Sequence, residues 1–584
     1  MSRLLFRGMD FDRAHFLAVA RGERPADVVF RGGRLVNVLT GEVYRCDVAV
    51  AAGRVAALGE GFDGMTMVDV TGRYLAPGLI DAHCHVESTL VPPAELARVA
   101  AAHGVTTLVA DTHEIANVLG PDGIRYMATD ARGAPARFVF QAPSCVPATP
   151  LATSGGRLDA ADLAGLRTEG VVWGLAEVMD VPGAAGGNPE VTAKIAAFTD
   201  RPVDGHAPGL TPPLLDAYCA AGVTNDHEST TVAEGRDKLR RGMAVFLREG
   251  SVARDLITLL PLVTPEQERR LALCTDDRHP DDLLAKGTID HAVRRAIAGG
   301  VPPVTALRLA TLNAADLLGL SDRGALVPGR LADLIVFDDL EAPRPSQVYL
   351  AGRLVAEDGA LPPHIPNIVP PAVRDTVHID WDGIDLRLPA QIGAMRAMRL
   401  HPDDLWTDEV WVGPRVENGL VVADPDRDLA KLVVIERHTA SGRVGRALLA
   451  NLGLRRGAIA STVCHDHHNL IAAGADDRSL LTAARAVAEA GGGLAVAVNE
   501  TVAALLPLPI AGLMSDQPIE DVAAALGRIV AAARDLGVTP PHPVMSLSFL
   551  GLEVIPALKL TDRGLIDVAQ QTVVAPFAEQ PVST

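Results

Sequence analysis

The 584-residue sequence has few of the features that mark several classes of protein. Its six cysteines are widely and irregularly spaced without a CxxC pair, which excludes a disulfide-rich scaffold. No stretch of about 18 uncharged apolar residues offers a membrane span. The opening residues, MSRLLFRGMDFDRAHF, are interrupted by charges and contain no signal-peptide apolar core. These absences favour a reduced, cytoplasmic setting.

Basic residues are also outnumbered. Lys and Arg total 53 against 72 Asp and Glu, which gives a formal net charge of −19. A chain with this charge and no basic run is poorly suited to bind nucleic acid or a membrane surface. We therefore expect a small-molecule substrate and neither a nucleic-acid nor a membrane partner. A homodimer is expected because two-fold assemblies are the commonest.

Two separated segments share an alternation of apolar and polar residues with regularly placed glycines, which is typical of short strands and tight turns. They span residues 27–75 and 324–359, and the string GRLV occurs in both, at 33–36 and 352–355. We interpret them as halves of one small β-sandwich split by an inserted domain. The first half is predicted to span residues 1–75, which include a helix within 1–24. The second half is predicted to span residues 324–360.

The inserted segment, 76–323, predicts an α/β fold. Eight β-rich runs (LIDAHCHV, VTTLVADTH, RFVFQAP, VVWGLAEV, PVDGHA, GVTNDHE, MAVFLREG and LALCTDD) alternate with helix-like runs. Nearly continuous apolar strands in repeated βα units indicate a parallel sheet, and eight units indicate a (β/α)8 barrel. The segment 361–375 includes LPPHIPNIVPP and predicts a stiff linker. It leads to a separate C-terminal α/β domain, 376–584.

Metal-ligand side chains gather where the predicted barrel strands end. Function in such barrels collects at the carboxyl ends of the strands. Residues i and i+2 of a strand share a face, so His83 and His85 both point into the barrel while Cys84 points outward. A lone strand histidine is usually a hydrogen-bonded core residue, but a hydrophobic barrel would not bury a whole set unpaired. The set is His83, His85, His113, Glu114, Glu177, His206, His227 and Asp276.

These residue types predict metal-assisted hydrolysis. One catalytic metal needs only three protein ligands, and this set offers six. The six are His83, His85, Glu177, His206, His227 and Asp276. Glu177 can bridge two divalent ions about 3.5–4 Å apart, which together generate a hydroxide near neutral pH. Asp276 can bind a metal and also accept a proton. Imidazole and carboxylate ligands suit Zn²⁺, Mn²⁺ or Fe²⁺ without deciding among them.

Long strings in the chain resemble the adenine deaminase family of the amidohydrolase superfamily. They include PGLIDAHCHVEST, DTHEIANVLG, GLAEVMDVPG, AGVTNDHEST and CTDDRHPDDL along the barrel, and CHDHHNLIAAG near the C-terminus. The resemblance implies deamination of adenine to hypoxanthine and ammonia at an iron or manganese centre, in purine salvage. It also implies that the six residues named above hold the metals. Many superfamily members bridge their metals with a carbamylated lysine on strand 4, where this chain has Glu177.

Other polar residues have open roles. His113 and Glu114 could line the purine pocket, donate a proton to a ring nitrogen or bind metal, and otherwise form a loop-capping network. Glu114 is accordingly a third candidate catalytic residue, beside Asp276 and Glu177. Arg248, Glu249 and Ser251 follow the seventh strand and could contact the base, with a barrel-mouth ion pair as the alternative.

The run CHDHHN contains His465, His467 and His468, which break an apolar run. A C-terminal domain that folds over the barrel mouth could exclude water and bring one of them to the site. A surface cluster or a weak second metal site is the alternative. Two other functions also compete with adenine deamination: a related amidohydrolase acting on another purine or a cyclic amide, and a non-catalytic metal-binding scaffold.

Overall fold

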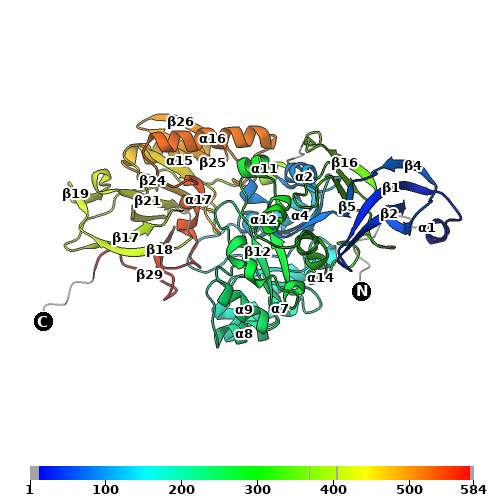
Figure 1. Cartoon of the computed structure of the whole chain (residues 1–584). Helices are drawn as coiled ribbons and strands as arrows, with labels where there is room; N and C mark the ends of the chain where they lie inside the picture. The colour runs from blue at the N-terminus through cyan, green and yellow to red at the C-terminus, as the bar shows by residue number, and fades with distance from the viewer. Residues whose placement is uncertain (1–11, 367–368, 403–404, 579–584) are drawn as a thin grey trace.

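The computed structural model describes residues 12–366, 369–402 and 405–578. Figure 1 shows three parts side by side: a sheet near the N-terminus, a central barrel and a C-terminal domain. Helix α1 (Arg13–Ala20) begins after Asp12, whose carboxylate accepts a hydrogen bond from the His15 backbone N–H at 2.9 Å. An oxygen-bearing residue at this position satisfies a helix N–H that has no partner within the helix. The part of the predicted helix within residues 1–11 lies outside the described residues.

Both flanking segments of the barrel join one eight-stranded sheet. Its strands are β1 (Ala26–Asn37), β2 (Glu42–Ala51), β3 (Arg54–Gly59), β4 (Gly64–Asp69), β5 (Tyr74–Pro77), β14 (Leu334–Phe337), β15 (Gln347–Leu350) and β16 (Arg353–Glu357). The order is β16-β15-β14-β5-β1-β2-β3, with β4 also on β1. The β1–β2 register shifts between Phe30 and Gly33, and Gly32 there has a φ of 77°. Glycine adopts this left-handed conformation without the steric cost that a side chain brings.

Eight strands form the central barrel, one from each predicted run. They are β6 (Leu79–His85), β7 (Val105–Asp111), β8 (Arg137–Phe140), β9 (Leu175–Val178), β10 (Val203–Gly205), β11 (Asn225–Asp226), β12 (Ala244–Arg248) and β13 (Leu271–Cys274). Paired strands are parallel. The last strand meets the first, because Asp276 N donates to His83 O at 3.0 Å. The predicted α/β fold class with its barrel is confirmed.

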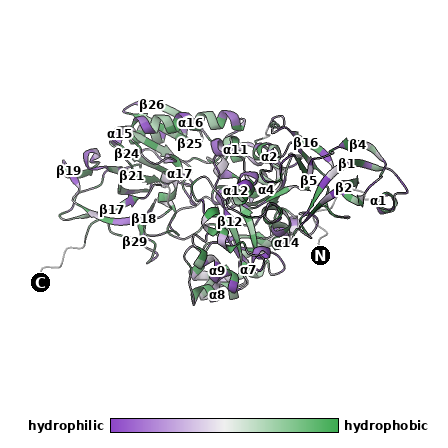
Figure 2. Ribbon diagram, in the orientation of Figure 1, coloured by the Kyte–Doolittle hydropathy of each residue, from purple (hydrophilic) through white to green (hydrophobic). Residues whose placement is uncertain are grey.

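Helices surround the strands of this barrel. They are α2 (Pro93–Ala102), α3 (His113–Leu119), α4 (Pro121–Asp130), α5 (Ala160–Glu169), α6 (Val181–Gly186), α7 (Pro189–Ala196), α8 (Leu214–Ala220), α9 (Val232–Arg240), α10 (Leu256–Leu259), α11 (Pro280–Lys286), α12 (Ile289–Ala298), α13 (Pro303–Arg308) and α14 (Ala314–Leu317). Every residue of β6 and β7 is buried. In Figure 2, β12 is mostly green while α7 and α9 carry both colours. Strands covered on both faces need continuous apolar runs, whereas the surrounding helices need one apolar stripe.

The C-terminal domain is built on a second eight-stranded sheet, of order β18-β17-β22-β21-β24-β23-β25-β26. The strands are β17 (Met395–Leu400), β18 (Thr407–Val412), β21 (Leu429–Ile435), β22 (Val444–Ala450), β23 (Ala458–Ser461), β24 (Leu470–Gly474), β25 (Gly493–Val498) and β26 (Thr501–Pro507). Helices α15 (Asp477–Glu489) and α16 (Ile519–Asp535) lie along it in Figure 1. Smaller elements are β19 (Arg415–Glu417), β20 (Leu420–Val422), α17 (Pro543–Ser548), β27 (Leu558–Thr561), β28 (Gly564–Asp567) and β29 (Thr572–Val574).

The described part of the proline-rich segment packs against the barrel. Arg98 of α2 donates to the Pro362 carbonyl at 2.7 Å, and His364 contacts Glu95 at 2.5 Å. Residues 367 and 368 of the predicted linker lie outside the description. Among the described helices, none combines the length and the apolar character that a bilayer crossing requires.

Candidate active site

The two histidines at the end of β6 face one point inside the barrel. Their Nε2 atoms lie 3.1 Å apart, and the side chains of His83 and His85 are nearly fully buried. Cys84 points the other way, with its Sγ 3.6 Å from the Val109 carbonyl on β7. This is the alternation that an extended strand imposes. Two imidazole nitrogens at this separation can share one ion, since each metal–nitrogen bond is about 2.0–2.1 Å.

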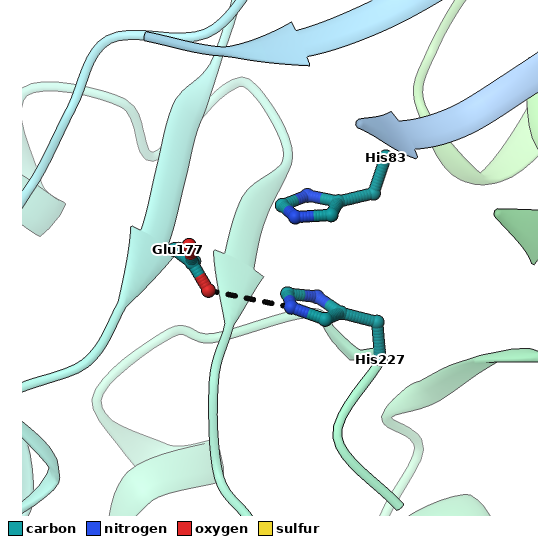
Figure 3. Close-up of side chains that lie close together, drawn as sticks. All are labelled: His83, Glu177 and His227. Atoms are coloured by element: carbon teal, nitrogen blue, oxygen red, sulfur yellow. Dashed lines mark ion pairs between the residues drawn. The ribbon is translucent and has the colours of Figure 1, made fainter. Parts of the chain in front are cut away.

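Glu177 at the end of β9 lies among histidines from several strand ends. One carboxylate oxygen, Oε2, is 2.7 Å from His206 Nδ1 and 3.3 Å from His227 Nε2. The other, Oε1, is 3.5 Å from His85 Nε2. Figure 3 shows His83 and His227 facing this carboxylate from two different segments. Because its two oxygens face different histidines, Glu177 has the arrangement that a carboxylate bridging two ions requires.

Asp276 completes the cluster where the barrel closes. Its Oδ1 lies 3.1 Å from His85 Nε2 and 3.6 Å from His83 Nε2, while Oδ2 accepts a hydrogen bond from Arg248 at 3.0 Å. The backbone of Asp276 has a φ of 56°, in the left-handed region. A residue other than glycine adopts this conformation at a cost, and such strain gathers at functional sites. The barrel closure thus fixes a carboxylate against both histidines of β6.

The donor atoms form overlapping groups of three, with the donor atoms of each group within 4.8 Å of one another. In this barrel cluster the groups are His83–Glu177–His227, His83–His85–Asp276, His85–His113–Glu177 and His206–His227–Glu228. All six predicted metal ligands occur in them. The buried His206 Nε2 has no hydrogen-bond partner among the described residues. A buried polar atom without a partner is costly, so this donor set fits divalent cations.

The pKa values of the side chains in the barrel cluster are strongly shifted by their neighbours. Burial alone would lower the pKa of His83, but hydrogen bonds with Asp204 and Asp276 raise it to about 10. Glu177 and Asp276 show the opposite balance: burial favours the neutral acid, yet the neighbouring imidazoles hold both pKa values well below the usual range. Ionised carboxylates therefore stabilise protons on the rings. A divalent cation held by these rings would have to displace those protons, so its binding would depend on pH.

His113 and Glu114 open helix α3, directly after β7. His113 Nδ1 is 3.3 Å from Asp111 Oδ1 and 3.5 Å from Glu177 Oε1. Glu114 Oε1 lies 3.8 Å from His85 Nδ1, and neither Glu114 oxygen has a hydrogen-bond partner within the described chain. The structure therefore brings both residues to the edge of the barrel cluster.

Arg248, the last residue of β12, and the two residues predicted beside it lie in different environments. Arg248 is buried and makes an ion pair with Glu228 beside its contact with Asp276. Glu249 and Ser251 point elsewhere. Glu249 pairs with Arg295 on α12, and Ser251 donates a hydrogen bond to a carboxylate on α11. The structure brings Arg248 to the barrel cluster as an ion pair and turns the other two side chains toward the outer helices.

Comparison with known proteins agrees with this geometry. Residues 74–355 match the amidohydrolase family, and residues 404–572 match the adenine deaminase C-terminal domain. An adenine deaminase of Desulfatibacillum aliphaticivorans is 46% identical over 554 residues, which cover 94% of this chain and 97% of that protein. One from Nitratidesulfovibrio vulgaris is 47% identical over 556 residues, covering 94% of this chain and 96% of that one.

The chain belongs to the adenine deaminase family. The resemblance noted in the sequence is confirmed. Among solved structures, a β-aspartyl dipeptidase from Fervidobacterium islandicum AW-1 aligns at 16% identity with a TM-score of 0.45. The alignment covers 59% of this chain and 100% of the dipeptidase chain.

The C-terminal domain of this chain contacts the barrel through residues 464–468. His465 Nδ1 lies 3.4 Å from Glu114 Oε1, and Asp466 Oδ1 lies 3.4 Å from His113 Nε2. His468 is further from Glu114, at 4.0 Å. His467 instead faces its own segment, with Nε2 3.9 Å from Cys464 Sγ. Of the three histidines expected to cover the barrel mouth, the structure brings His465 closest to the barrel cluster.

Several residues of the site were absent from the sequence predictions. Glu228 directly follows His227, so the pair HE was a visible signal. Asp111 precedes His113 by two positions and shares its surroundings. Asp466 stands between two predicted histidines, but no pattern in the sequence shows that its carboxylate faces the barrel.

Proposed function

We infer that this protein hydrolyses adenine to hypoxanthine and ammonia, with one water consumed for each molecule deaminated. The observation that carries the inference is the convergence of imidazoles and carboxylates from six strand ends on one point of the barrel. This convergence occurs in a chain that belongs to the adenine deaminase family. Family membership supplies the substrate, and the barrel cluster supplies the means of hydrolysis.

The barrel cluster would hold two divalent ions through six side chains: His83, His85, Glu177, His206, His227 and Asp276. Mn²⁺ or Fe²⁺ is the expected metal, and Zn²⁺ suits the same ligands. When bound, such ions would supply a hydroxide near neutral pH and would polarise the group under attack. Glu177 is the residue proposed to lie between them, because its two oxygens face different histidines.

Asp276 is proposed to carry the proton that the departing amine needs. Its Oδ2 is held by Arg248, while Oδ1 faces the barrel cluster. In the metal-free cluster the imidazoles of His83 and His85 keep this carboxylate ionised despite burial, and its position leaves Oδ1 as the proposed proton acceptor. Returning this proton to the amine at C6 completes a general acid–base cycle.

Residues at the edge of the barrel cluster are proposed to hold the purine. Glu114 has two buried oxygens without hydrogen-bond partners, which suits an acceptor for ring or amine N–H groups. Glu114 remains a candidate proton donor to a ring nitrogen, and His113 a neighbouring contact. Arg248 acts on this site through Asp276. Glu249 and Ser251 are not favoured as base contacts, since their side chains pair with α12 and α11.

The wider setting is also a proposal. The six cysteines are free, in keeping with a reduced cytoplasmic compartment. Conversion of adenine to hypoxanthine is proposed to serve purine salvage. A homodimer is proposed from the frequency of two-fold assemblies alone.

The test is ammonia release by the chain reconstituted separately with Mn²⁺, Fe²⁺ and Zn²⁺, with adenine, guanine, cytosine and a cyclic imide as substrates. Stoichiometric hypoxanthine and ammonia from adenine support the proposal. Ring opening of the imide without ammonia would indicate a related amidohydrolase. Two bound metals with no reaction on any substrate would indicate a scaffold.

A further inference from the structure

The two ring nitrogens of His113 face carboxylates of different domains. On the barrel side, Asp111 Oδ1 lies 3.3 Å from Nδ1 and also accepts the His113 backbone N–H at 2.9 Å. Asn117 donates to the His113 carbonyl at 3.0 Å, which ties the backbone to α3. The opposite ring nitrogen, Nε2, faces Asp466 of the C-terminal domain at 3.4 Å. The barrel thus fixes the backbone of His113 by hydrogen bonds, while carboxylates of Asp111 and Asp466 lie beside its two ring nitrogens.

The segment that carries Asp466 is itself firmly held. The His468 N–H donates to the Cys464 carbonyl at 2.7 Å, which closes a tight turn. The His465 N–H donates to Ser548 Oγ at 3.2 Å, and Arg437 donates to the His468 carbonyl. A side chain on such a turn has little freedom, as positioning groups require.

The charge of Asp466 also depends on this contact. Its side chain is almost fully buried, and Oδ2 has no hydrogen-bond partner within the described residues. Burial disfavours the carboxylate, but His113 and then His465 hold its pKa far below the usual value. A buried carboxylate that faces imidazoles is stable only while they stay in place, so the two domains constrain each other here.

We propose that Asp466 is a positioning residue of the active site, which holds the His113 imidazole against Asp111 and Glu177. The proposal rests on the deamination proposed above. It makes the C-terminal domain part of the catalytic apparatus and not only a cover. The His113 ring contacts Glu177 at 3.5 Å, so a displaced ring changes the carboxylate proposed to lie between the ions. Loss of such an outer partner typically costs about 10–100-fold in activity or metal affinity.

The test compares two buried aspartates of the same domain. Asp466→Asn keeps the shape of the side chain and removes its charge. Asp562→Asn is the matched control, because Asp562 accepts two hydrogen bonds from Thr153 of the barrel, at 2.8 and 2.6 Å, away from His113. We expect kcat for adenine, or bound metal, to fall about 10–100-fold in Asp466→Asn with KM little changed. Asp562→Asn should stay near wild type, and Asp466→Glu should recover part of the loss.

A double-mutant cycle separates positioning from domain docking. In a His113→Gln background, Asp466→Asn should have almost no further effect on kcat or metal content, because its target ring is gone. Equal losses in Asp466→Asn and Asp562→Asn, or additive losses in the cycle, would overturn the proposal.

The position of the ring is a readout independent of turnover. Crystal structures of the wild type and of Asp466→Ala should differ in the orientation of the His113 imidazole. A ring that stays in place, together with unchanged metal content, would overturn the proposal even if the protein proved inactive on adenine. A metal-loaded wild type that releases no ammonia from adenine would refute the deamination instead.

Discussion

The barrel and the C-terminal domain both bury a group of histidines, and the two groups have opposite surroundings. In the barrel, carboxylates face the rings and outweigh the cost of burial, so the pKa of His83 rises to about 10 and that of His206 to about 9. In the C-terminal domain, burial dominates and Arg437 adds repulsion. There the pKa of His467 falls to about 4 and that of His438 to about 3.

The comparison teaches that carboxylates, more than histidines, distinguish the two sites. The strings HCH and HDHH are both dense in imidazoles. Both histidines of the first string face several acidic side chains, whereas in the second string His465 is the histidine whose pKa the acidic neighbours raise. His465 belongs to the C-terminal group by sequence and to the barrel group by environment. Burial alone would lower its pKa, but Glu114 leads the groups that raise it to about 9. A metal centre is expected where the carboxylates are.

The largest expected effect is loss of metal and turnover when a histidine of the barrel group, and not one of the C-terminal group, is replaced. His83→Ala or His85→Ala should lose at least one metal equivalent and about 10³-fold or more in turnover, because several kcal/mol of transition-state stabilisation disappear. Metal analysis and ammonia release measure both. His467→Gln is the matched control and should keep both metals. A His83 variant with wild-type metal content and rate would refute a two-metal barrel centre.

The next variant asks whether Asp276 moves a proton or only binds metal. Asp276→Asn can still offer an oxygen to an ion but cannot accept a proton, so kcat should fall about 10²–10⁴-fold. Bound metal should fall far less than in the histidine variants. A pH–rate profile on the fully metallated variant is the measurement. A wild-type rate with an unchanged acidic limb would make Glu114 or His465 the leading proton carrier.

Glu177→Gln tests the carboxylate between the histidines. The amide keeps the size but removes the charge that offsets two cations, so one ion should be poorly retained and turnover should fall about 10–100-fold. Titration of the apo-variant with Mn²⁺ counts the bound equivalents. Two tightly bound ions in this variant would show that Glu177 does not bridge them.

The smallest effect concerns a carboxylate of the C-terminal domain that caps backbone. Glu436 accepts hydrogen bonds from the N–H groups of Thr439 and Ser441 and from both hydroxyls. Burial opposes ionisation, but these bonds, led by Ser441, lower its pKa to about 2. Glu436→Gln should lower the free energy of unfolding by about 1.5–3 kcal/mol at pH 7.

The pH dependence of this effect has a definite sign. The carboxylate of Glu436 ionises near pH 4.5 when unfolded and near 2 when folded, so its contribution is complete above about 4.5 and disappears as pH falls toward 2. Urea unfolding of wild type and variant at several pH values should therefore converge in acid. A constant difference across that range would contradict the assignment, as would loss of turnover in the folded variant at pH 7.

The strand ends of the barrel were predictable from the sequence, because strands of a parallel barrel are buried on both faces and therefore occur as continuous apolar runs. All eight runs became strands, and period two placed His83 and His85 on one face. No such rule was available after Arg248, because β12 ends there and alternation does not orient Glu249 or Ser251. Side-chain direction in a loop depends on what packs around it.

Side-chain contacts between the barrel and the C-terminal domain could not be predicted from the sequence. The run CHDHH predicted a polar cluster near the barrel but could not show which side chain faces inward. The answer depends on how a turn at Cys464–His468 docks against α3, across more than three hundred residues of chain. Asp466 was therefore missed, while His467 was included although it faces its own segment.

The central claim is that the carboxylate-rich barrel cluster binds two divalent ions and deaminates adenine with both. The most direct measurement is ammonia release from adenine as Mn²⁺ is added stepwise to the metal-free protein. We predict that the rate rises with added metal and becomes constant at two equivalents per chain. A rate that becomes constant at one equivalent, or no ammonia at any metal content, would contradict the claim.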